Sequence, residues 1–289
     1  MINEKDEFLH EYLNNEYWRE SYYYNFMAPD DNIFGVCTYG IMPEVMEAHY
    51  LISVWIKGKL KFFADHLKIE EFVLNPIADL QMEIKEPLKK ILMQYTNTKR
   101  KFKLEFTFNG RTPIYKYKGW KFNEILEQEH YEQSGELKGK IQIKDSVYDF
   151  IALGQRDHSW GIRDWVRIDN WFWVSAQFKD MAINCWVVKI QDTKRIDGFI
   201  ATDDQVIPLK EVHVNDQYEN GQKVPVSSEI RLVSEDNMEY LLKTRRLYHL
   251  VLPQTSKKGY SEIFETISTF NINNRNEIGH GVVEYLKKF

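Results

Sequence analysis

The chain has 289 residues, of which 43% are apolar and 28% are charged, and its formal net charge is −5. These values are typical of a globular protein with one large domain or two ordinary ones, and they disfavour a disordered chain or a dedicated nucleic-acid-binding protein. The residues up to Leu13 are too polar for a signal peptide, and no apolar run reaches membrane-spanning length. We therefore expect a cytoplasmic protein without a transmembrane segment. Cys37 and Cys185 both lie in apolar runs, which predicts buried free thiols.

The first segment has the spacing of a short helix, and almost every later segment has the character of a β-strand. Apolar residues recur at helical intervals in the first segment, at Phe8, Leu9, Tyr12 and Leu13. Residues 101–108 alternate strictly between polar and apolar types and then meet Asn109-Gly110, a strong turn signal. Three further pairs of β-rich runs flank short turns: residues 49–56 with 60–67, 171–178 with 181–190, and 229–234 with 238–244. Short strands at this spacing predict a barrel or a sandwich rather than a doubly wound sheet.

Three short matches at nearly the same offset suggest an internal repeat. Residues 38–41 (TYGI) resemble residues 159–162 (SWGI), the turn at Lys57 resembles the turn at Lys179, and residues 87–89 (PLK) recur at 208–210. Three matches in one register indicate two copies of one β unit. A polar stretch between Asn123 and Gly135 then predicts a first domain over residues 1–127 and a second over residues 128–289. The predicted fold is all-β, with two barrel-like units in tandem after a short N-terminal helix.

The run from Arg156 to Trp165 is the densest cluster of chemically useful residues. It holds three candidate acids or bases: His158, Asp157 and Asp164. On a strand, His158 and Trp160 share one face, whereas Asp157 lies on the other. Trp160, Trp165 and Arg163 could surround a substrate, and His130 and Tyr131 could approach from a neighbouring strand. Burial raises the pKa of a carboxyl group and lowers that of a histidine, which would leave either group able to transfer a proton near neutral pH.

The proposed repeat separates the ionisable residues of this run from its framework. Asp157 and His158 align with Val36 and Cys37, so the ionisable pair is peculiar to the second copy, whereas the framework around Gly161 is common to both. The alternative interpretation is a buried Arg-Asp-His network that only fixes the packing. His130, His158 and Asp157 do not have a recognised ligand spacing, so we expect neither a metal nor a cofactor.

Residues 154–165, GQRDHSWGIRDW, resemble the signature of the carotenoid 1,2-hydratase (hydroxyneurosporene synthase) superfamily. Residues 130–133 with Gly139, and residues 279–285, are also similar to that group. The resemblance implies two lipocalin-like barrel or half-barrel domains in tandem. It also implies a hydratase that protonates an isoprenoid double bond to a tertiary cation, with His158 and Trp160 in the site and Asp157 as the neighbouring carboxyl group. Fungal lipocalin-like Diels–Alderases are distant relatives of this superfamily.

The sequence therefore favours an enzyme that binds an apolar small molecule and no nucleic acid. The expected reaction is acid-catalysed hydration, dehydration or cyclisation of an isoprenoid, as performed by a hydro-lyase or an isomerase. Aromatic faces would stabilise the intermediate cation. Two alternatives remain open: a non-catalytic carrier of a lipid or terpenoid, and a pericyclase whose cavity only folds a polyene.

Overall fold

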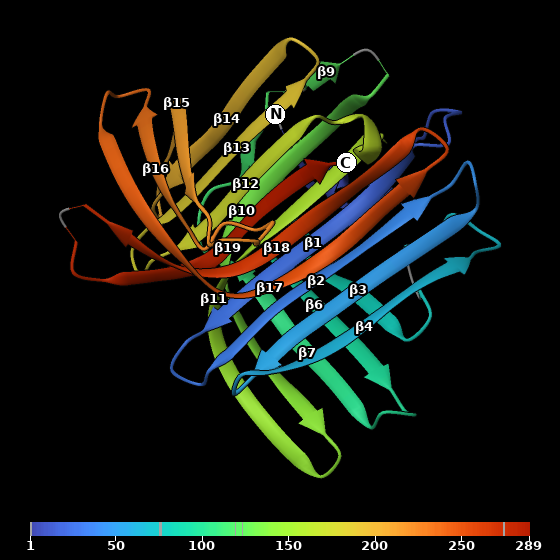
Figure 1. Ribbon diagram of the computed structural model, residues 1–289. Coiled ribbons are helices and arrows are strands. Elements are labelled where there is room, and N and C mark those ends of the chain that lie inside the picture. Colours follow the sequence, from blue (N-terminus) through green and yellow to red (C-terminus); the bar gives the residue numbers. More distant parts are fainter. Residues whose placement is uncertain (1, 75–76, 119, 123, 274) are drawn as a thin grey trace. The chain divides into compact units, whose positions relative to one another are not determined.

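The computed structural model describes residues 2–74, 77–118, 120–122, 124–273 and 275–289 (Figure 1). The chain forms two compact units, one made of residues 1–119 and 127–163, the other of residues 120–126 and 164–289. Both units consist almost entirely of β-strands, which confirms the predicted all-β fold with two barrel-like units. Among the described residues, no helix is long and apolar enough to cross a membrane.

The first unit is built on one curled sheet that forms a half-barrel. Its elements are η1 (Glu4–Glu7), β1 (Trp18–Ala28), β2 (Ile33–Met42), β3 (Glu47–Ile56), β4 (Lys59–Lys68), β5 (Leu80–Glu86), β6 (Lys90–Asn97), β7 (Phe102–Gly110), β8 (Tyr115–Lys116), most of β10 (Leu126–Ile143) and β11 (Ser146–Arg163). The strand order is β4-β3-β2-β1-β11-β10-β7-β6-β5. Strands far apart in this order meet across the interior. For example, the hydroxyl of Tyr24 in β1 donates to the sulfur of Met82 in β5 at 3.3 Å.

Alternation and turn chemistry explain why these residues form this sheet. Along β7 the side chains of Phe102, Leu104, Phe106 and Phe108 are buried, while the intervening side chains are more exposed. The predicted hairpin at Lys57-Gly58 is present between β3 and β4, with φ angles of 49° and 77° that fit a type I′ turn. The turn predicted at Asn109-Gly110 is not present, because both residues still belong to β7 and Asn109 pairs with Lys90 and Glu136.

The second unit is a closed eight-stranded barrel in which β19 returns to pair with β12 (Figure 1). Its barrel strands are β12 (Asn170–Gln177), β13 (Ala182–Ile190), β14 (Thr193–Ala201), β15 (Val206–Gln217), β16 (Ser227–Ser234), β17 (Glu239–Ser256), β18 (Gly259–Ile272) and β19 (Ile278–Lys288). The unit also includes β9 (Trp120–Phe122) and η2 (Trp165–Arg167), which are not strands of the barrel. Apolar side chains such as Phe172, Phe264 and Tyr285 form its core. Closure leaves no free sheet edge in this barrel.

The N-terminal segment differs from the helix expected around Phe8 to Leu13. The helical part is a single 3-10 turn at Glu4–Glu7, capped by the side chain of Asn3. The side chains of Phe8, Tyr12 and Leu13 are about half exposed, at 46%, 45% and 58%. Because these apolar residues are not buried together on one face, their spacing does not give a packed helix.

The internal repeat does not correspond to the two units. Residues 38–41 lie in β2 and residues 159–162 in β11, on either side of β1 in one sheet, where Ser21 pairs with both Gly40 and Ser159. Residues 87–89 form a turn, whereas residues 208–210 lie inside β15. Glycine beside aromatic and β-branched residues recurs in many strands, so these matches reflect composition rather than duplication.

The division into units also differs from the expected ranges 1–127 and 128–289. Strands β10 and β11 pair with β7 and β1, so they belong to the first unit. The motif is consequently split: residues up to Arg163 lie in the first unit, and Asp164 and Trp165 lie in the second.

Candidate functional site

The register between β1 and β11 fixes which motif residues share a face. Pairing is continuous from Trp18 opposite Ile162 to Met27 opposite Leu153. Because no bulge interrupts this register, Asp157 and His158 point to opposite sides of the sheet. His158 lies opposite Tyr22 on the inner face, where its side chain is 1% exposed.

His158 is held by hydrogen bonds at both ring nitrogens. Its Nε2 lies 2.5 Å from Oε1 of Glu20, a fully buried carboxylate two residues before Tyr22 on β1. Its Nδ1 lies 3.2 Å from the hydroxyl of Tyr131 on β10. Glu20 therefore orients the imidazole, and the opposite nitrogen is directed at a phenol.

Glu20 also binds His10 from the N-terminal segment. The backbone N–H of His10 donates to Oε2 at 3.0 Å, and Nδ1 of His10 lies 3.0 Å from Oε1. Burial opposes ionisation of Glu20, but the hydrogen bonds with His10 and His158 hold the pKa of this carboxyl below its usual value. Glu20 is thus an ionised acceptor, which requires an N–H on each imidazole nitrogen that faces it.

The ionised carboxylate determines what His158 can do. With Nε2–H donated to Glu20, a neutral His158 accepts from Tyr131 at Nδ1, and a protonated His158 donates to it. Burial raises the pKa of Tyr131 well above its usual value, so this residue stays a phenol. Glu20, His158 and Tyr131 together form a chain through which a proton can move without a change in side-chain position.

Aromatic rings surround this chain. Tyr22 stacks on the His158 ring with centroids 4.0 Å apart, and Trp160 lies 5.2 Å away in a tilted arrangement. His10 stacks on Trp160 at 3.7 Å. These faces exclude water and present π electrons to any cation formed nearby.

Arg156 lies on the same inner face, two residues before His158. Its side chain is 1% exposed, and Nη1 lies 2.6 Å from Oε1 of Glu7, which is fully buried. Nε of Arg156 donates to the side chain of Gln133 at 3.1 Å. The interior of the half-barrel therefore contains a buried cation beside the His158 chain.

The opposite face of β10 and β11 holds the other candidates of the first unit. His130 lies 2.8 Å from Glu132, and one ligand atom of each lies within 4.8 Å of one on Asp157. Arg163 donates to Ser159 at 2.7 Å and to the side chain of Gln128. Of the two residues expected to approach from a neighbouring strand, Tyr131 meets His158, whereas His130 does not.

Asp164 and Trp165 belong to the second unit. Nζ of Lys258 donates to Asp164 at 3.2 Å, and Arg167 lies 4.0 Å from the same carboxylate. Trp165 packs edge to face against Trp171, with centroids 4.9 Å apart. Asp164 thus lies beside two basic side chains and Trp165 against a second tryptophan, within that unit.

Two groups have the donor types of a metal site: His10 with Glu20 and His158, and His130 with Glu132 and Asp157. In the first group, Oε1 of Glu20 already accepts hydrogen bonds from both imidazoles. In this group the atoms of Glu20 and His158 are therefore engaged with one another, whereas Nε2 of His10 is buried and forms no hydrogen bond with the described residues.

Sequence reasoning missed Glu20, His10 and Glu7. A signal for Glu20 is present, because it alternates with the aromatic residues Tyr22 and Tyr24 on one face of a strand. A carboxylate at such a position is rarely buried without a partner. No comparable local signal marks His10 and Glu7, which reach the interior from an irregular segment.

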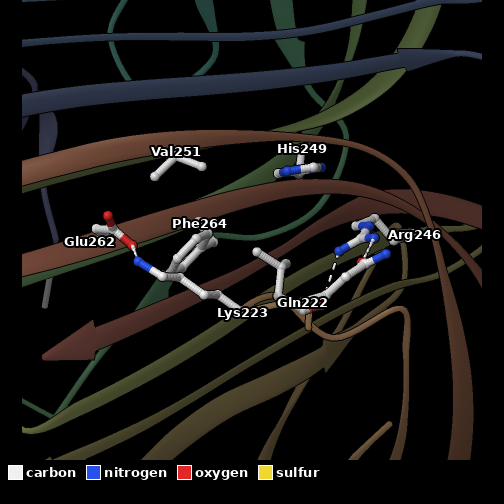
Figure 2. A pocket seen from close by; sticks show the side chains of 8 residues that line it. Gln222, Lys223, Arg246, His249, Val251, Glu262 and Phe264 are labelled. Carbon is white, nitrogen blue, oxygen red and sulfur yellow. Dashed lines mark hydrogen bonds and ion pairs between the residues drawn. The ribbon is translucent and has the colours of Figure 1, made fainter. Parts of the chain in front are cut away.

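The second unit has a separate pocket of about 390 Å³ (Figure 2). The residues that line it are Gln222, Lys223, Val224, Arg246, His249, Val251, Glu262 and Phe264. Phe264 belongs to the barrel core, Arg246 donates to Gln222 at 2.5 Å, and Lys223 pairs with Glu262 at 3.2 Å (Figure 2). Burial, together with nearby Arg246, lowers the pKa of His249, so its imidazole is neutral at neutral pH. This pocket is suited to binding rather than to proton transfer.

Comparison with known proteins places the whole chain in one family and one fold. The model of DUF7064, a domain of unknown function, matches residues 3–288. None of the curated proteins is significantly similar in sequence. A protein of Nitrosomonas europaea assigned as AttH has a similar structure, with a TM-score of 0.69, 13% identity, and coverage of 93% of this chain and 92% of the other.

Two further solved structures have the same architecture. Kievitone hydratase from Nectria haematococca has a TM-score of 0.66, 12% identity, and coverage of 93% and 88%. CghA in complex with Sch210972 has a TM-score of 0.63, 10% identity, and coverage of 95% and 89%. These proteins have the carotenoid hydratase-like lipocalin fold, and the chain shares this fold with them.

Proposed function

We propose that this chain, which belongs to the DUF7064 family, catalyses hydration, dehydration or cyclisation of an apolar, isoprenoid-like substrate by proton transfer. The observation that carries the proposal is the buried chain Glu20–His158–Tyr131, enclosed by aromatic rings. An alkene is a weak base, so its protonation needs a proton donor that is held away from water. A carboxylate that orients a histidine, which in turn contacts a phenol, meets that need.

The proposed proton path starts at His158 in its imidazolium form. Tyr131 gives its hydroxyl proton to one carbon of the double bond and receives the Nδ1 proton of His158 in return. The other carbon becomes a tertiary cation, to which water adds, and the proton released by that water returns to the chain. The sum is addition of one water to one double bond, with Glu20 ionised throughout.

The aromatic rings have a separate role in this scheme. A cation beside Trp160, Tyr22 or Tyr131 gains about 0.5–2 kcal/mol from each favourably placed ring. Because a ring offers no lone pair that bonds to the cation, it stabilises the intermediate without trapping it. If an internal double bond attacks the cation before water does, the same site gives cyclisation.

The assignment of the carboxylate differs from the sequence-based expectation. Asp157 was the expected partner of His158, but it lies on the other face of β11. We therefore assign that role to Glu20. The similarity in fold to a named hydratase supports the reaction class, although fold alone does not determine function.

The test uses acyclic terpenoid alcohols and acids as probes in deuterium oxide, followed by mass spectrometry. Protonation of the alkene places deuterium on carbon, and hydration adds one water. We expect turnover by the unmodified protein and a rate about 10² to 10⁴ lower for His158→Gln. Equal isotope incorporation by both proteins would rule out His158 as part of the proton path.

A non-catalytic carrier remains the second candidate. The pocket of the second unit is lined by paired polar and charged side chains and by the apolar side chains of Val251 and Phe264 (Figure 2). A carrier predicts saturable binding of the same probes without isotope incorporation. Phe264→Ser would weaken that binding, whereas it would leave turnover at His158 unchanged.

A further inference from the structure

We infer that Arg156 is a binding site for the carboxylate of an apolar acid, and that Glu7 occupies this site when no ligand is bound. The inference rests on the proposed function, because it takes His158 to be the place where the rest of the substrate reacts. It adds a substrate class: an amphipathic molecule with an acidic head and an unsaturated apolar body.

Arg156 is built into the interior as a charged group. It lies on β11 with a side chain that is 1% exposed, over the rings of Phe108 at 5.5 Å and Tyr131 at 5.4 Å. Among its neighbours, Gln133 accepts from Nε at 3.1 Å. A planar guanidinium with π contacts on its faces presents its remaining N–H groups in one plane, which is the geometry that carboxylates match.

Glu7 shows where an anion binds in this interior. Its Oε1 lies 2.6 Å from Nη1 of Arg156, and its Oε2 accepts the backbone N–H of Leu88 at 2.6 Å. Leu88 is in the turn between β5 and β6. A guanidinium and a backbone N–H thus form a cradle for one carboxylate, and the hydroxyl of Tyr131 lies within reach of the same group.

The fit between Glu7 and Arg156 is incomplete. Within the described part of the chain, Nη2 of Arg156 is buried without a well-formed hydrogen bond, and the hydroxyl of Tyr24 lies beside the guanidinium. A buried donor without a well-formed hydrogen bond is unfavourable, and a carboxylate that binds both Nη1 and Nη2 would satisfy it. The cradle can therefore hold a free carboxylate with more hydrogen bonds than it forms with Glu7.

The segment that carries Glu7 covers the His158 chain as well. It comprises residues 3–15, lies outside the strands of the sheet, and has only the 3-10 turn at Glu4–Glu7 as regular structure. Three residues later in this segment, His10 stacks on Trp160 and binds Glu20. A ligand carboxylate that replaces Glu7 would displace this segment and make room beside Trp160 and His158.

The spacing of the two sites sets the length of the substrate. Arg156 and His158 are two residues apart on one strand, which is about 6.6 Å. The carboxylate and the reacting double bond should therefore be separated by a few carbon atoms. A long hydrocarbon without a polar head would not use the cradle.

The test measures equilibrium binding of geranic acid and of methyl geranate by tryptophan fluorescence and calorimetry. Glu7→Gln removes the competing charge, so we expect it to bind the acid about tenfold or more tightly than the unmodified protein does, with no such change for the ester. Glu11→Gln is the matched control, since Glu11 is an exposed residue of the same segment, and it should bind both probes as the unmodified protein does.

The role of Arg156 is tested in a variant that lacks the Glu7 charge as well, so that no unpaired charge is left in the core. Arg156→Gln alone would leave Glu7 buried without its partner, so the double variant Glu7→Gln/Arg156→Gln is used, and thermal unfolding checks its fold. We expect this variant to lose the preference for the acid over the ester. The inference is overturned if Glu7→Gln binds acid and ester equally or binds neither, or if the folded double variant still prefers the acid.

These measurements need no turnover, so they separate the two proposals. An acid preference that depends on Arg156 in a protein without isotope incorporation would support the anion site and contradict the catalytic function. Turnover that depends on His158, in a protein that does not prefer the acid to the ester, would support the catalytic function and contradict the anion site.

Discussion

Nε2 of His158 lies 2.5 Å from Oε1 of Glu20, although the two residues belong to strands that are separated by most of the first unit's sequence. The pairing of β1 with β11 brings them together on the inner face of the half-barrel. Because side chains alternate along β11, His158 lies on the inner face, where a proton can move, and Asp157 lies on the outer face.

Replacement of Glu20 by Gln should destabilise the protein in a pH-dependent way. The isosteric amide keeps an oxygen but loses the charge-assisted hydrogen bonds to His10 and His158, which we expect to cost about 1–3 kcal/mol near neutral pH. Because the folded pKa of Glu20 lies below its ordinary value of 4.5, its stabilising contribution is complete above that value and is lost as the pH falls through the folded pKa.

Urea unfolding at several pH values checks this expectation. The difference in unfolding free energy between the unmodified protein and Glu20→Gln should stay constant above about pH 6 and shrink as the pH falls below the ordinary value of 4.5. Glu16→Gln, an exposed site near the start of the same strand, should show almost no difference. A Glu20 difference that grows on acidification would contradict the assigned ionisation.

Gly161 should be required for the shape of the motif rather than for chemistry. Its φ is +130°, and a Cβ added there would lie 2.2 Å from the backbone oxygen of Glu127. Gly161→Ala must therefore move two strand backbones apart, at a cost of about 2 kcal/mol or more. Gly221 is a suitable comparison, because its φ is +79° but a Cβ there has no heavy atom within 4 Å.

Thermal or urea unfolding of both alanine variants tests this difference. Gly221→Ala should cost about 1 kcal/mol, since only its backbone conformation is strained. Similar losses at the two positions would show that the close approach at Gly161 is relieved by small movements.

The elements that follow local rules were predictable, and the contacts between distant strands were not. The hairpin turns at Lys57 and Lys179 and the alternation along β7 follow from side-chain types. Alternation also predicts that His158 and Trp160 share a face, and their rings lie 5.2 Å apart. The partner of His158 depends on which strand lies beside β11, and this is determined by the packing of the whole sheet.

The internal repeat is the instructive error. It predicted two β units, and two are present. However, the two matching segments, at Thr38 and Ser159, lie on either side of β1 in a single sheet. The boundary derived from the same matches separated β10 and β11 from the strands to which they are hydrogen-bonded. Short matches in a strand-rich chain are expected from composition alone.

Both cysteines should be protected thiols. Cys37 and Cys185 are buried and neither forms a disulfide, and burial raises the pKa of the Cys37 thiol, which disfavours the reactive thiolate. Alkylation without a reductant, followed by intact mass measurement, should modify neither residue in the native protein and both after denaturation. Absence of modification in the denatured protein would indicate a disulfide.

We also expect the purified protein to be active without a bound metal. One nitrogen of His10 and one of His158 are engaged by the Glu20 carboxylate, which leaves that carboxylate little capacity to bind an ion as well. Elemental analysis of active protein, before and after treatment with a chelator, checks this expectation. Zinc or iron at one equivalent per chain, with activity lost on chelation, would contradict it.

The most direct test compares two adjacent residues of the motif in one turnover assay. His158→Gln alters the inner face, and Asp157→Asn alters the outer face of the same strand. With a terpenoid probe that the unmodified protein converts, we predict a loss of about 10² to 10⁴ in rate for folded His158→Gln and a nearly unchanged rate for Asp157→Asn. Full activity of His158→Gln, or an equally large loss in folded Asp157→Asn, would contradict the assignment of proton transfer to the Glu20–His158–Tyr131 chain.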